Sequence, residues 1–400
     1  MSYTPDSGQQ KYGANVNGTD STMQPQLSPY LWWKKALIEA AREQYFTQMA
    51  DVKSMPKHMG KQIKKYHWMP LLDDRNVNDQ GIDATGADIS DGNLYGSSRD
   101  IGTIQGKLPA LSETGGRVNR VGFTRLTIEG TFEKFGFFDE FTQESLDFDS
   151  EEELFGHMQT EMIKGASQMT EAALQIDLLN AAGVHVYGGG ATAKNEVSGA
   201  DGQETLVTYE DLMKLDIELF DNRTPKQTTI ITGSRMQDTK TIKGGYVAYI
   251  SSALRPTLER MVDLHGERAF IPTHQYGAAT TIMRGEIGTV GNFRFIEVPE
   301  MLHWAGAGAA EGTNGGYRAT NGKYDVFPML VVGAESFTTI GFQTNGNMVK
   351  FKTTTKMPGE GVADRADPYG ETGFSSIKWY YGTMIMRPER IACIYSPAEV

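Results

Sequence analysis

Residues 149–182 are the stretch that most restricts how this chain can fold. Ser150-Glu151-Glu152-Glu153 has the form of a capping box, in which the serine oxygen accepts a free backbone N–H and Glu153 reaches back. Apolar side chains then recur at helical spacing: Leu154, Met158, Met162, Ala166, Met169, Ala173 and Ile176. Gly183 and the glycines at 188–190 indicate where the helix ends. A helix over 150–182 would be roughly 48 Å long at about 1.5 Å per residue, and its methionine- and alanine-rich face is expected to be buried.

Two further segments predict the arms of one long hairpin. Residues 62–72 and 117–132 have the alternation of a strand, and Pro70 marks an edge position or the end of the first arm. Between them, residues 73–116 lack a hydrophobic period and are long for a loop in a folded chain. We expect this segment to be a functional excursion or to be ordered by a partner.

Charge is unevenly distributed along this part of the chain. The whole chain carries 38 lysines and arginines against 50 acids, a net charge of −12, which disfavours tight binding to nucleic-acid backbones. Residues 51–65 hold five lysines and one aspartate, whereas residues 73–100 hold seven aspartates and two arginines. The segment 61–68 mixes lysines with aromatic residues, as nucleic-acid grooves do, but the acidic chain favours packing on an acidic protein surface.

The remaining chain predicts a mixed α+β protein with two or three lobes, because 400 residues exceed one simple core. Helices are expected at 29–50, 208–220 and 234–242. Strands are expected at 228–232 (buried), at 285–298 as a pair around Gly291, at 327–340 with a bend at Gly333, at 377–386 and at 389–395. Residues 305–322 and 353–373 are expected to be loops. Residues 1–28 have no hydrophobic period, so we expect them to be ordered only in an assembly.

No catalytic or cofactor motif is present in the sequence. It has no Walker loop, no HExxH, no nucleophile elbow and no paired cysteines, and the glycine-rich stretch 306–312 misses dinucleotide spacing by one residue. His185 and His265 are candidate ligands that are better interpreted as packed or polar side chains. The acidic segment 73–100 lacks an EF-hand pattern and is better interpreted as a solvated face than as a cation site. We expect no enzyme activity, no metal or other cofactor, no disulfide, no signal peptide and no membrane span.

Several short segments, in the same order along the chain, carry a resemblance to a known family. They are residues 112–123 (Ser-Glu-Thr-Gly-Gly-Arg-Val-Asn-Arg-Val-Gly-Phe), 135–142, 284–297 (the most characteristic piece), 367–370, 377–379 and 387–391. Together they resemble the major capsid proteins of N-four-like short-tailed bacteriophages (podoviruses), and the similarity runs from about Pro29 to Tyr395.

The resemblance implies the tailed-phage major capsid fold of the Hong Kong ninety-seven type. Its parts would be an amino-terminal arm (1–60), an extended loop with an acidic insertion at its tip (61–135), a peripheral domain with the spine helix 150–182 (136–227), an axial domain (228–345) and a return to the peripheral domain (346–400). The implied function is self-assembly into an icosahedral shell that encloses the phage double-stranded DNA genome. An encapsulin-like protein compartment is the alternative.

The same resemblance implies the partners. They are other copies of the chain in pentamers and hexamers, packaged DNA bound without sequence specificity, and decoration, scaffolding and portal proteins, with no membrane. The protein would belong to the virion capsid and be assembled in the host bacterial cytoplasm. In this fold the extended loop lies over an adjacent subunit, so we expect its acidic tip to meet basic surface on a neighbour, for example residues 51–65. The expected inter-subunit contact residues are Lys61, Lys64, Lys65, Trp68, Asp73, Asp74, Asp79, Asp83, Asp88, Asp91, Arg117 and Arg120.

Overall fold

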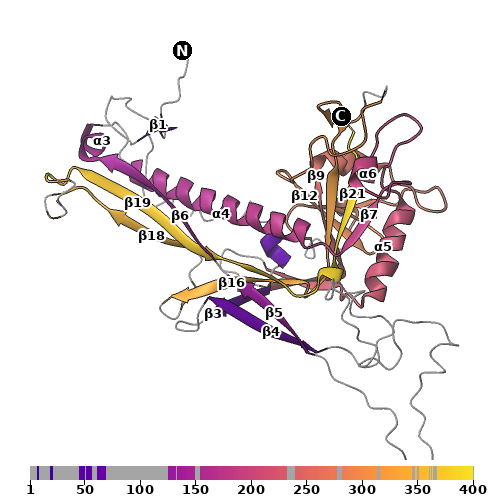
Figure 1. Ribbon diagram of the computed structural model, residues 1–400, viewed down its shortest axis with the longest axis horizontal. Coiled ribbons are helices and arrows are strands. Elements are labelled where there is room, and N and C mark those ends of the chain that lie inside the picture. Colours follow the sequence, from indigo (N-terminus) through magenta and orange to yellow (C-terminus); the bar gives the residue numbers. More distant parts are fainter. Residues whose placement is uncertain are drawn as a thin grey trace, which may run out of the picture.

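The computed structural model describes residues 7–8, 19–20, 45–49, 51–55, 61–68, 125–131, 133–148, 154–231, 239–276, 282–312, 316–344, 347–348, 351–359, 361, 363 and 367–399. In this part of the chain a long helix, α4, joins two bodies of different character (Figure 1). A narrow three-stranded sheet lies along the first half of the helix, and an eight-stranded sheet with short helices gathers at its other end. The fold is therefore α+β, as the sequence predicts.

Helix α4 (Leu154–Asn180) confirms the long helix expected at 150–182, and its capping box lies outside the described residues. The helix ends before Gly183, but this glycine does not adopt the left-handed conformation of a helix cap. A Cβ at Gly183 would lie 2.7 Å from the carbonyl oxygen of Pro388, and the Gly183 N–H donates to that oxygen at 3.0 Å. Glycine is needed here because another backbone passes close by.

The buried face of α4 follows the predicted stripe only in its first half. There the predicted residues are buried: Met158, Met162 and Ala166. In the second half Met169 and Ile176 are 52% and 47% exposed and Ala173 is half-buried, so the prediction is wrong for these three. Leu174 and Leu178 are fully buried instead. The face rotates because the first half packs on the three-stranded sheet and the second half on the core of the eight-stranded sheet.

The three-stranded sheet is antiparallel in the order β18 (Phe351–Lys356), β19 (Thr372–Tyr381), β6 (Glu133–Thr142). Phe141, Ile377 and Trp379 lie on the face that packs against α4, and the short helix α3 (Gln143–Phe148) follows β6. Strand β18 falls in a segment expected to be a polar loop, because its run of threonines and lysines hides the alternation. The strand expected at 377–386 is divided between β19 and β20 (Thr383–Ile385).

The eight-stranded sheet has the order β10-β11-β12-β9-β15-β21-β7, with β8 also paired to β9. Its strands are β7 (Val184–Tyr187), β8 (Gln227–Ile231), β9 (Thr239–Ser251), β10 (Ile271–Pro272), β11 (Glu286–Val290), β12 (Phe293–Val298), β15 (Phe327–Val332) and β21 (Ile391–Ser396). Every residue of β15 and of β21 is buried, as expected for strands covered on both faces. One face carries α5 (Tyr209–Asp221) and α6 (Arg255–Glu259), and the other receives the end of α4.

The predicted elements of this body are confirmed with two corrections. The helix expected at 208–220 is α5, where Thr208 and Asp211 form a capping box, and the strand pair at 285–298 is β11–β12, turning at Gly291 with φ of 57°. The helix expected at 234–242 is wrong for residues 239–242, which belong to β9, where β-branched residues suit a strand. Residues 234–238 lie outside the described residues. The predicted strand at 228–232 exists as β8, but only its Ile230 is buried among residues 227–230.

A further sheet joins β16 (Phe337–Thr344) to β17 (Asn347–Met348), β20 and β3 (Asp51–Met55). The segment expected as one strand at 327–340 is therefore two strands in different sheets, separated at Gly333. Strand β3 was not predicted, and it runs parallel to β16. The shortest elements are β1 (Ser7–Gly8), β2 (Thr19–Asp20), β13 (Ala319–Thr320), β14 (Lys323–Tyr324) and the 3₁₀ turns η1 (Phe46–Met49), η3 (Lys194–Glu196), η4 (Ser252–Leu254), η5 (Thr273–Gln275) and η8 (Pro388–Arg390).

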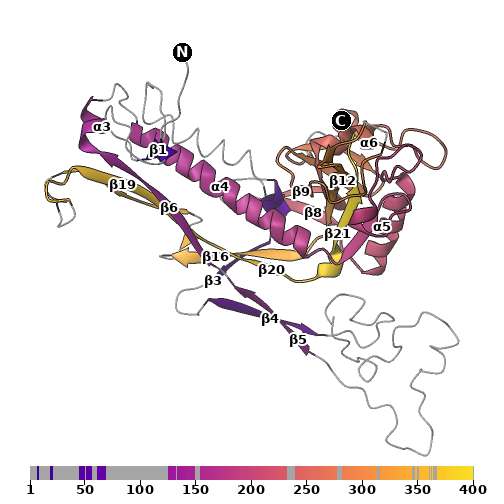
Figure 2. The same ribbon diagram turned by 45° about the horizontal axis from the view of Figure 1, so that its top comes forward.

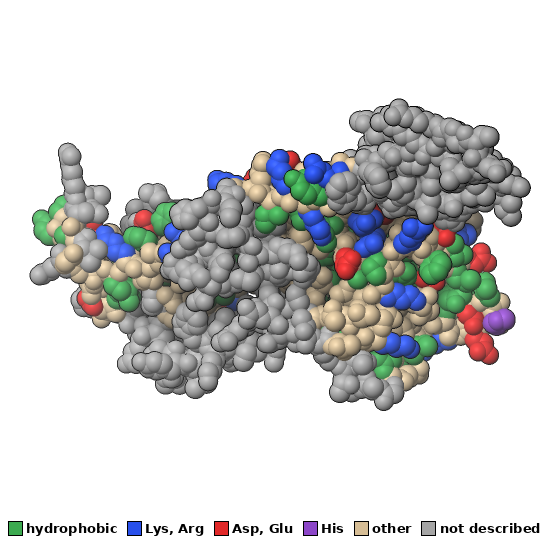
Figure 3. Space-filling view, turned by 90° about the horizontal axis from the view of Figure 1, so that it is seen from below, with side chains coloured by type: hydrophobic (Ala, Val, Ile, Leu, Met, Phe, Trp, Pro, Cys, Tyr) green, Lys and Arg blue, Asp and Glu red, His purple; other side chains and the backbone are tan. Residues whose placement is uncertain are grey.

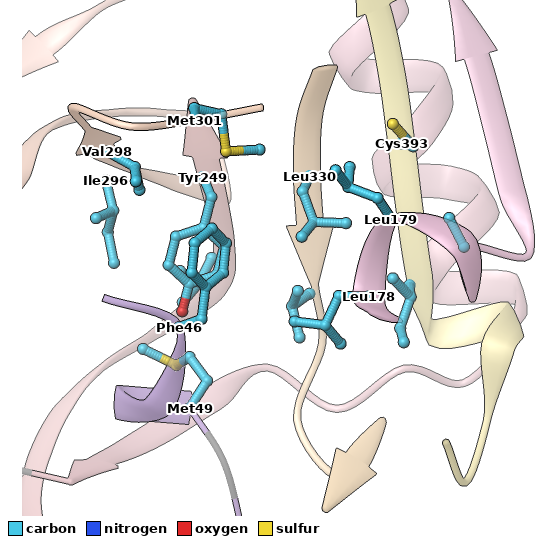
Figure 4. Packing of buried hydrophobic residues seen from close by; sticks show 14 of the residues in the cluster. Phe46, Met49, Leu178, Leu179, Tyr249, Ile296, Val298, Met301, Leu330 and Cys393 are labelled. Carbon is cyan, nitrogen blue, oxygen red and sulfur yellow. The ribbon is translucent and has the colours of Figure 1, made fainter. Parts of the chain in front are cut away.

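The segment 45–49 is anchored in the core. It is the only described part of the helix expected at 29–50, and there the chain forms the 3₁₀ turn η1. The rest of that helix lies outside the described residues. The centroids of the Phe46 and Tyr249 rings lie 4.4 Å apart (Figure 4). Glu171 of α4 accepts the Phe46 N–H at 3.0 Å and the Thr47 hydroxyl at 2.6 Å. A buried carboxylate with two donors thus fixes this amino-terminal segment to the helix.

Candidate inter-subunit contact surface

The hairpin of β4 (Gln62–Trp68) and β5 (Arg125–Thr131) confirms the predicted pairing of two arms, with Gln62 opposite Thr131 and Trp68 opposite Arg125. It extends from the rest of the subunit below α4 (Figure 2). The end at Thr131 is attached, because β6 begins at Glu133. The end at Trp68 lies about 20 Å from it, at roughly 3.3 Å per residue of strand.

The two faces of this hairpin have different environments. Ile63 and Ile128 pack against Met384 and Met386, which gives the hairpin a small apolar contact with its own subunit. Tyr66 on the other face is 56% exposed. The Arg125 guanidinium lies 4.2 Å from the centroid of the Tyr66 ring, a cation–π contact at the surface. One face is therefore anchored and the other is available to a neighbour.

Two of the predicted contact lysines have partners within the hairpin's own subunit. Lys64 forms an ion pair with Glu129, and the hydrogen bond to that carboxylate raises the pKa of Lys64. Since both side chains are exposed, the pair adds little stability. Lys65 Nζ lies 3.1 Å from Met386 Sδ, and Lys61 is exposed just before β4. Trp68 is placed by its backbone at the register position opposite Arg125.

The other predicted contact residues lie outside the described residues: Asp73, Asp74, Asp79, Asp83, Asp88, Asp91, Arg117 and Arg120. The structure therefore places only the lysines and the tryptophan of the set, with Lys64, Lys65 and Trp68 in β4 and Lys61 directly before it.

The most characteristic sequence segment, 284–297, holds a buried ion pair that the sequence analysis missed. Arg294 donates from Nε and Nη2 to the two oxygens of Glu286, at 2.8 and 2.7 Å. The Tyr276 hydroxyl and the Met283 N–H also donate to Glu286, at 3.0 and 2.8 Å. Burial raises the pKa of Tyr276 to about 12. The available signal was one acid and one base, Glu286 and Arg294, within two neighbouring apolar strands, and their ion pair holds β11 on β12.

The structure shows the contacts of the two candidate histidine ligands and of the glycine-rich loop 306–312. His185 Nδ1 lies 3.0 Å from the Tyr395 hydroxyl, and burial lowers the pKa of His185. His265 is exposed in a turn that Asp263 closes by accepting two backbone N–H groups. In the glycine-rich loop 306–312, a Cβ at Gly308 would lie 2.6 Å from the Val197 carbonyl oxygen, so this glycine permits packing.

Three observations on the described residues concern metal binding, thiol reactivity and membrane spans. That part contains no group of three or more His, Cys, Asp or Glu residues suited to a metal ion. Burial raises the pKa of Cys393 to about 12, so this cysteine is a thiol at neutral pH. Within the same residues, no helix combines the length and apolar character needed to cross a bilayer.

A pocket of about 390 Å³ beside α4 is lined by residues that include Phe46, Glu171 and Leu302.

The arrangement of long helix, narrow sheet and projecting hairpin is that of tailed-phage capsid proteins. A solved structure described as the capsid of Ralstonia phage GP4 aligns with a TM-score of 0.57, over 95% of this chain and 96% of that chain, at 11% sequence identity. That likeness shows the fold. The sequence profile of a family described as phage capsid protein matches residues 125–394.

The chain is also similar in sequence to the protein described as the major capsid protein of Pseudomonas phage KPP21. It is 56% identical over 391 residues, which cover 98% of both chains. The chain therefore belongs to the family of phage major capsid proteins. The resemblance carried by the short sequence segments is confirmed, and the encapsulin-like alternative is not favoured.

Proposed function

We propose that this chain assembles into the icosahedral shell that encloses the double-stranded DNA genome of a tailed phage. The observation that carries the proposal is the 56% identity with a phage major capsid protein over 98% of both chains. The form of the subunit supports it, since the hairpin and the outer face of α4 leave apolar surface uncovered, including Tyr66, Met169 and Ile176. Such surface is expected where subunits meet.

In this shell the copies form pentamers and hexamers, and the chain divides as the family resemblance implies. The arm is 1–60, the extended loop 61–135, the peripheral domain 136–227 with its spine helix, the axial domain 228–345, and the return 346–400. The pairing of β7 and β21 in the eight-stranded sheet supports moving 184–227 and 391–399 from the peripheral to the axial domain.

The protein acts in the virion capsid as a structural protein, without enzyme activity or cofactor, and assembles in the host bacterial cytoplasm. The net charge of −12 suits a shell that confines DNA without binding it by sequence. Scaffolding, portal and decoration proteins are its proposed further partners.

The predicted contact residues are proposed as one inter-subunit contact of the extended loop. The hairpin presents Lys61, Lys64, Lys65 and Trp68, and the loop that follows contributes Asp73, Asp74, Asp79, Asp83, Asp88, Asp91, Arg117 and Arg120. Reversing the three lysines to glutamate should reduce shell formation, and added salt should weaken assembly of the unchanged chain, because exposed charges are screened over about 8–10 Å. Normal assembly of the triple variant at low salt would remove these lysines from the contact.

Electron microscopy of the purified chain tests the main proposal. We expect hollow polyhedral particles from the chain expressed alone or with a scaffolding protein, and DNA-filled particles from infected cells. Particles that hold protein cargo in place of DNA would favour a compartment, and chains that stay monomeric under every assembly condition would overturn the shell function.

A further inference from the structure

Three connections between the eight-stranded sheet and the rest of the described chain meet at one place. They are residues 181–183 between α4 and β7, 333–336 between β15 and β16, and 386–390 between β20 and β21. We call these three connections the joint. The Gly183 N–H donates to the Pro388 carbonyl at 3.0 Å, and the Gly333 N–H donates to the Arg390 carbonyl at 3.0 Å. The connection 386–390 is therefore hydrogen-bonded to both of the others.

The connection 386–390 also carries the contact with the β4–β5 hairpin. The Met386 side chain is buried and packs with Ile63 of β4 and Ile128 of β5. The N–H groups of Met386 and Arg387 donate to the Ser336 carbonyl, at 2.9 and 3.1 Å. Met386 is thus bonded to the joint through its backbone and to the hairpin through its side chain. The position of the hairpin below α4 (Figure 2) therefore depends on the shape of 386–390.

Glu389 is a buried carboxylic acid with little support for a negative charge. The acidic and basic side chains seen from below reach the surface (Figure 3), whereas Glu389 is 2% exposed. Its Oε1 accepts from Arg387 Nη1 at 3.3 Å, and its Oε2 has no hydrogen-bond partner among the described residues. Burial raises the pKa of Glu389, although the charges of Arg387 and Arg390 oppose that change. The carboxyl group thus keeps its proton to a higher pH than an exposed glutamate does.

Buried polar atoms without a partner are concentrated at the joint. Five buried side-chain nitrogen or oxygen atoms of the described residues have no hydrogen-bond partner, and three of them are Glu389 Oε2, Arg390 Nε and Thr224 Oγ1. Thr224 lies at the joint because its methyl group would be 2.1 Å from a Cβ at Gly333. Folded proteins contain few such atoms, and each one calls for an explanation. An acceptor on Glu389 and a donor on the next residue, both without partners, indicate a second arrangement in which they are bonded.

Arg390 is held in its present position by two residues with an unfavourable backbone conformation. Its Nη1 lies 3.7 Å from Glu335 Oε2, and its Nη2 donates to the Arg223 carbonyl at 3.5 Å. Glu335 and Arg223 have φ of 55° and 53°, in the left-handed region that favours glycine. Such conformations persist where the surrounding structure enforces them, and they are concentrated at functional sites and switch regions. The contacts that hold Arg390 are therefore long, and both involve strained residues.

We propose that Glu389 is a proton-linked switch that sets the angle of the β4–β5 hairpin. While the carboxyl group is protonated, the joint keeps the arrangement described above. When the group loses its proton to water, the carboxylate needs donors for both oxygens, and Arg390 Nε is the unpartnered donor at the next residue. Bonding to it draws Arg390 away from its two strained partners, and the shift passes through Met386 to the hairpin. This inference concerns the folded subunit and goes beyond the proposed function.

The groups that face Glu389 come from every connection packed around it. Arg387 and Arg390 belong to its own connection, and Glu335 of the connection 333–336 lies beyond Arg390. Asn222, which follows α5, contributes a neutral amide that donates to the Glu389 carbonyl at 3.0 Å, and residues 181–183 carry no titratable side chain. A raised folded pKa gives stability that is present below the unfolded value and is lost as the pH rises through the folded value. The joint is therefore most stable in acid and loosens as the pH rises.

The distance between two spin labels in the unassembled full-length chain tests the switch. The labels are attached at Thr127→Cys on β5 and Lys214→Cys on α5, which are exposed positions, while the buried Cys393 stays unlabelled. A tilt of about 6° in a hairpin about 20 Å long moves its outer part by about 2 Å, at roughly 3.3 Å per residue. We expect the label distance to shift by about 2 Å or more between about pH 6 and about pH 8.5, above the ordinary range of a glutamate pKa.

Three substitutions in the labelled chain separate the charge from the shape. Glu389→Gln cannot ionise, so we expect it to keep the low-pH distance throughout. The matched control is Glu259→Gln, which makes the same change at an exposed glutamate of α6 and should follow the unchanged chain. Arg387→Gln removes the cation bonded to Glu389, so the distance change should have its midpoint at a higher pH. A purely structural role of Arg387 would leave that midpoint where it is.

Two results would overturn the switch. One is a label distance in the unchanged sequence that stays constant over this pH range, a result that does not depend on whether any variant folds. The other is a Glu389→Gln variant whose distance shifts with pH as that of the unchanged sequence does. Since the labelled chains are unassembled, both results would leave the proposed shell function standing.

Discussion

The eight-stranded sheet and the three-stranded sheet differ in how completely one subunit covers them. In the first, β15 and β21 are buried along their whole length, between α4 on one side and α5 and α6 on the other. In the second, one face packs on α4 and the other exposes Lys352, Lys378 and Phe138. Within one subunit, the strands at the centre of the first sheet are therefore covered on both faces, whereas the second sheet has one open face.

This contrast assigns different experiments to the two regions. Substitutions in the first body should lower the free energy of unfolding of an isolated subunit. Substitutions on the open surfaces should leave that quantity nearly unchanged and act on assembly.

The largest expected effect comes from placing a charge on the buried side of α4. Ala166 is fully buried, so Ala166→Glu would bury an unpaired carboxylate at a cost of several kcal/mol. Ala173 is half-buried, so Ala173→Glu should cost much less. Chemical denaturation of unassembled subunits would compare the two, and equal losses would mean that the buried face does not rotate along the helix.

Removing one member of the buried ion pair should be nearly as damaging. Arg294→Leu leaves Glu286 buried without its partner and should cost about 3–5 kcal/mol. The control is Arg255→Leu, which breaks surface pairs with Glu259 and Glu297 and should cost at most about 1 kcal/mol. If both variants unfold at the same denaturant concentration, the buried pair does not stabilise the sheet.

A smaller effect is expected at the anchor of the amino-terminal segment. Glu171→Gln replaces one of the two acceptors of Phe46 and Thr47 by an amide nitrogen, which should cost about 1–3 kcal/mol. Limited proteolysis should then cleave more readily near residues 45–49. Glu161→Gln changes an exposed carboxylate of the same helix and serves as the control; equal cleavage of the two variants would contradict the anchor.

The smallest effect is a pH dependence at Asp367. Hydrogen bonds from the Thr372 hydroxyl and N–H and from the Glu371 N–H lower the pKa of Asp367 in the folded chain. A lowered folded pKa gives stability that is present above the unfolded value and is lost as the pH falls through the folded value. Asp367→Asn should therefore flatten the acid side of a plot of unfolding free energy against pH. An unchanged acid side would show that the turn 367–370 holds without the charge.

Local sequence determined the elements whose information lies within a few residues. The α4 period, the helical pattern at 208–220, the Gly291 turn and the alternation of the hairpin arms each predicted an observed element. The family resemblance supplied the fold, because matching segments in order imply a common chain path. The same alternation placed Lys64 and Lys65 in one strand.

The tertiary structure decided what depends on neighbours distant in sequence. The buried side of α4 changes along the helix, because its first half packs on one sheet and its second half on another. The hydrophobic period of the sequence does not predict that change. The pairing of β3 with β16 joins residues 51–55 to 338–342, and a short basic segment gives no sign of it. Lys134, Lys352 and Lys378 form one surface only because β6, β18 and β19 are adjacent in the sheet. Backbone pairing thus brings together charges that the chain keeps far apart.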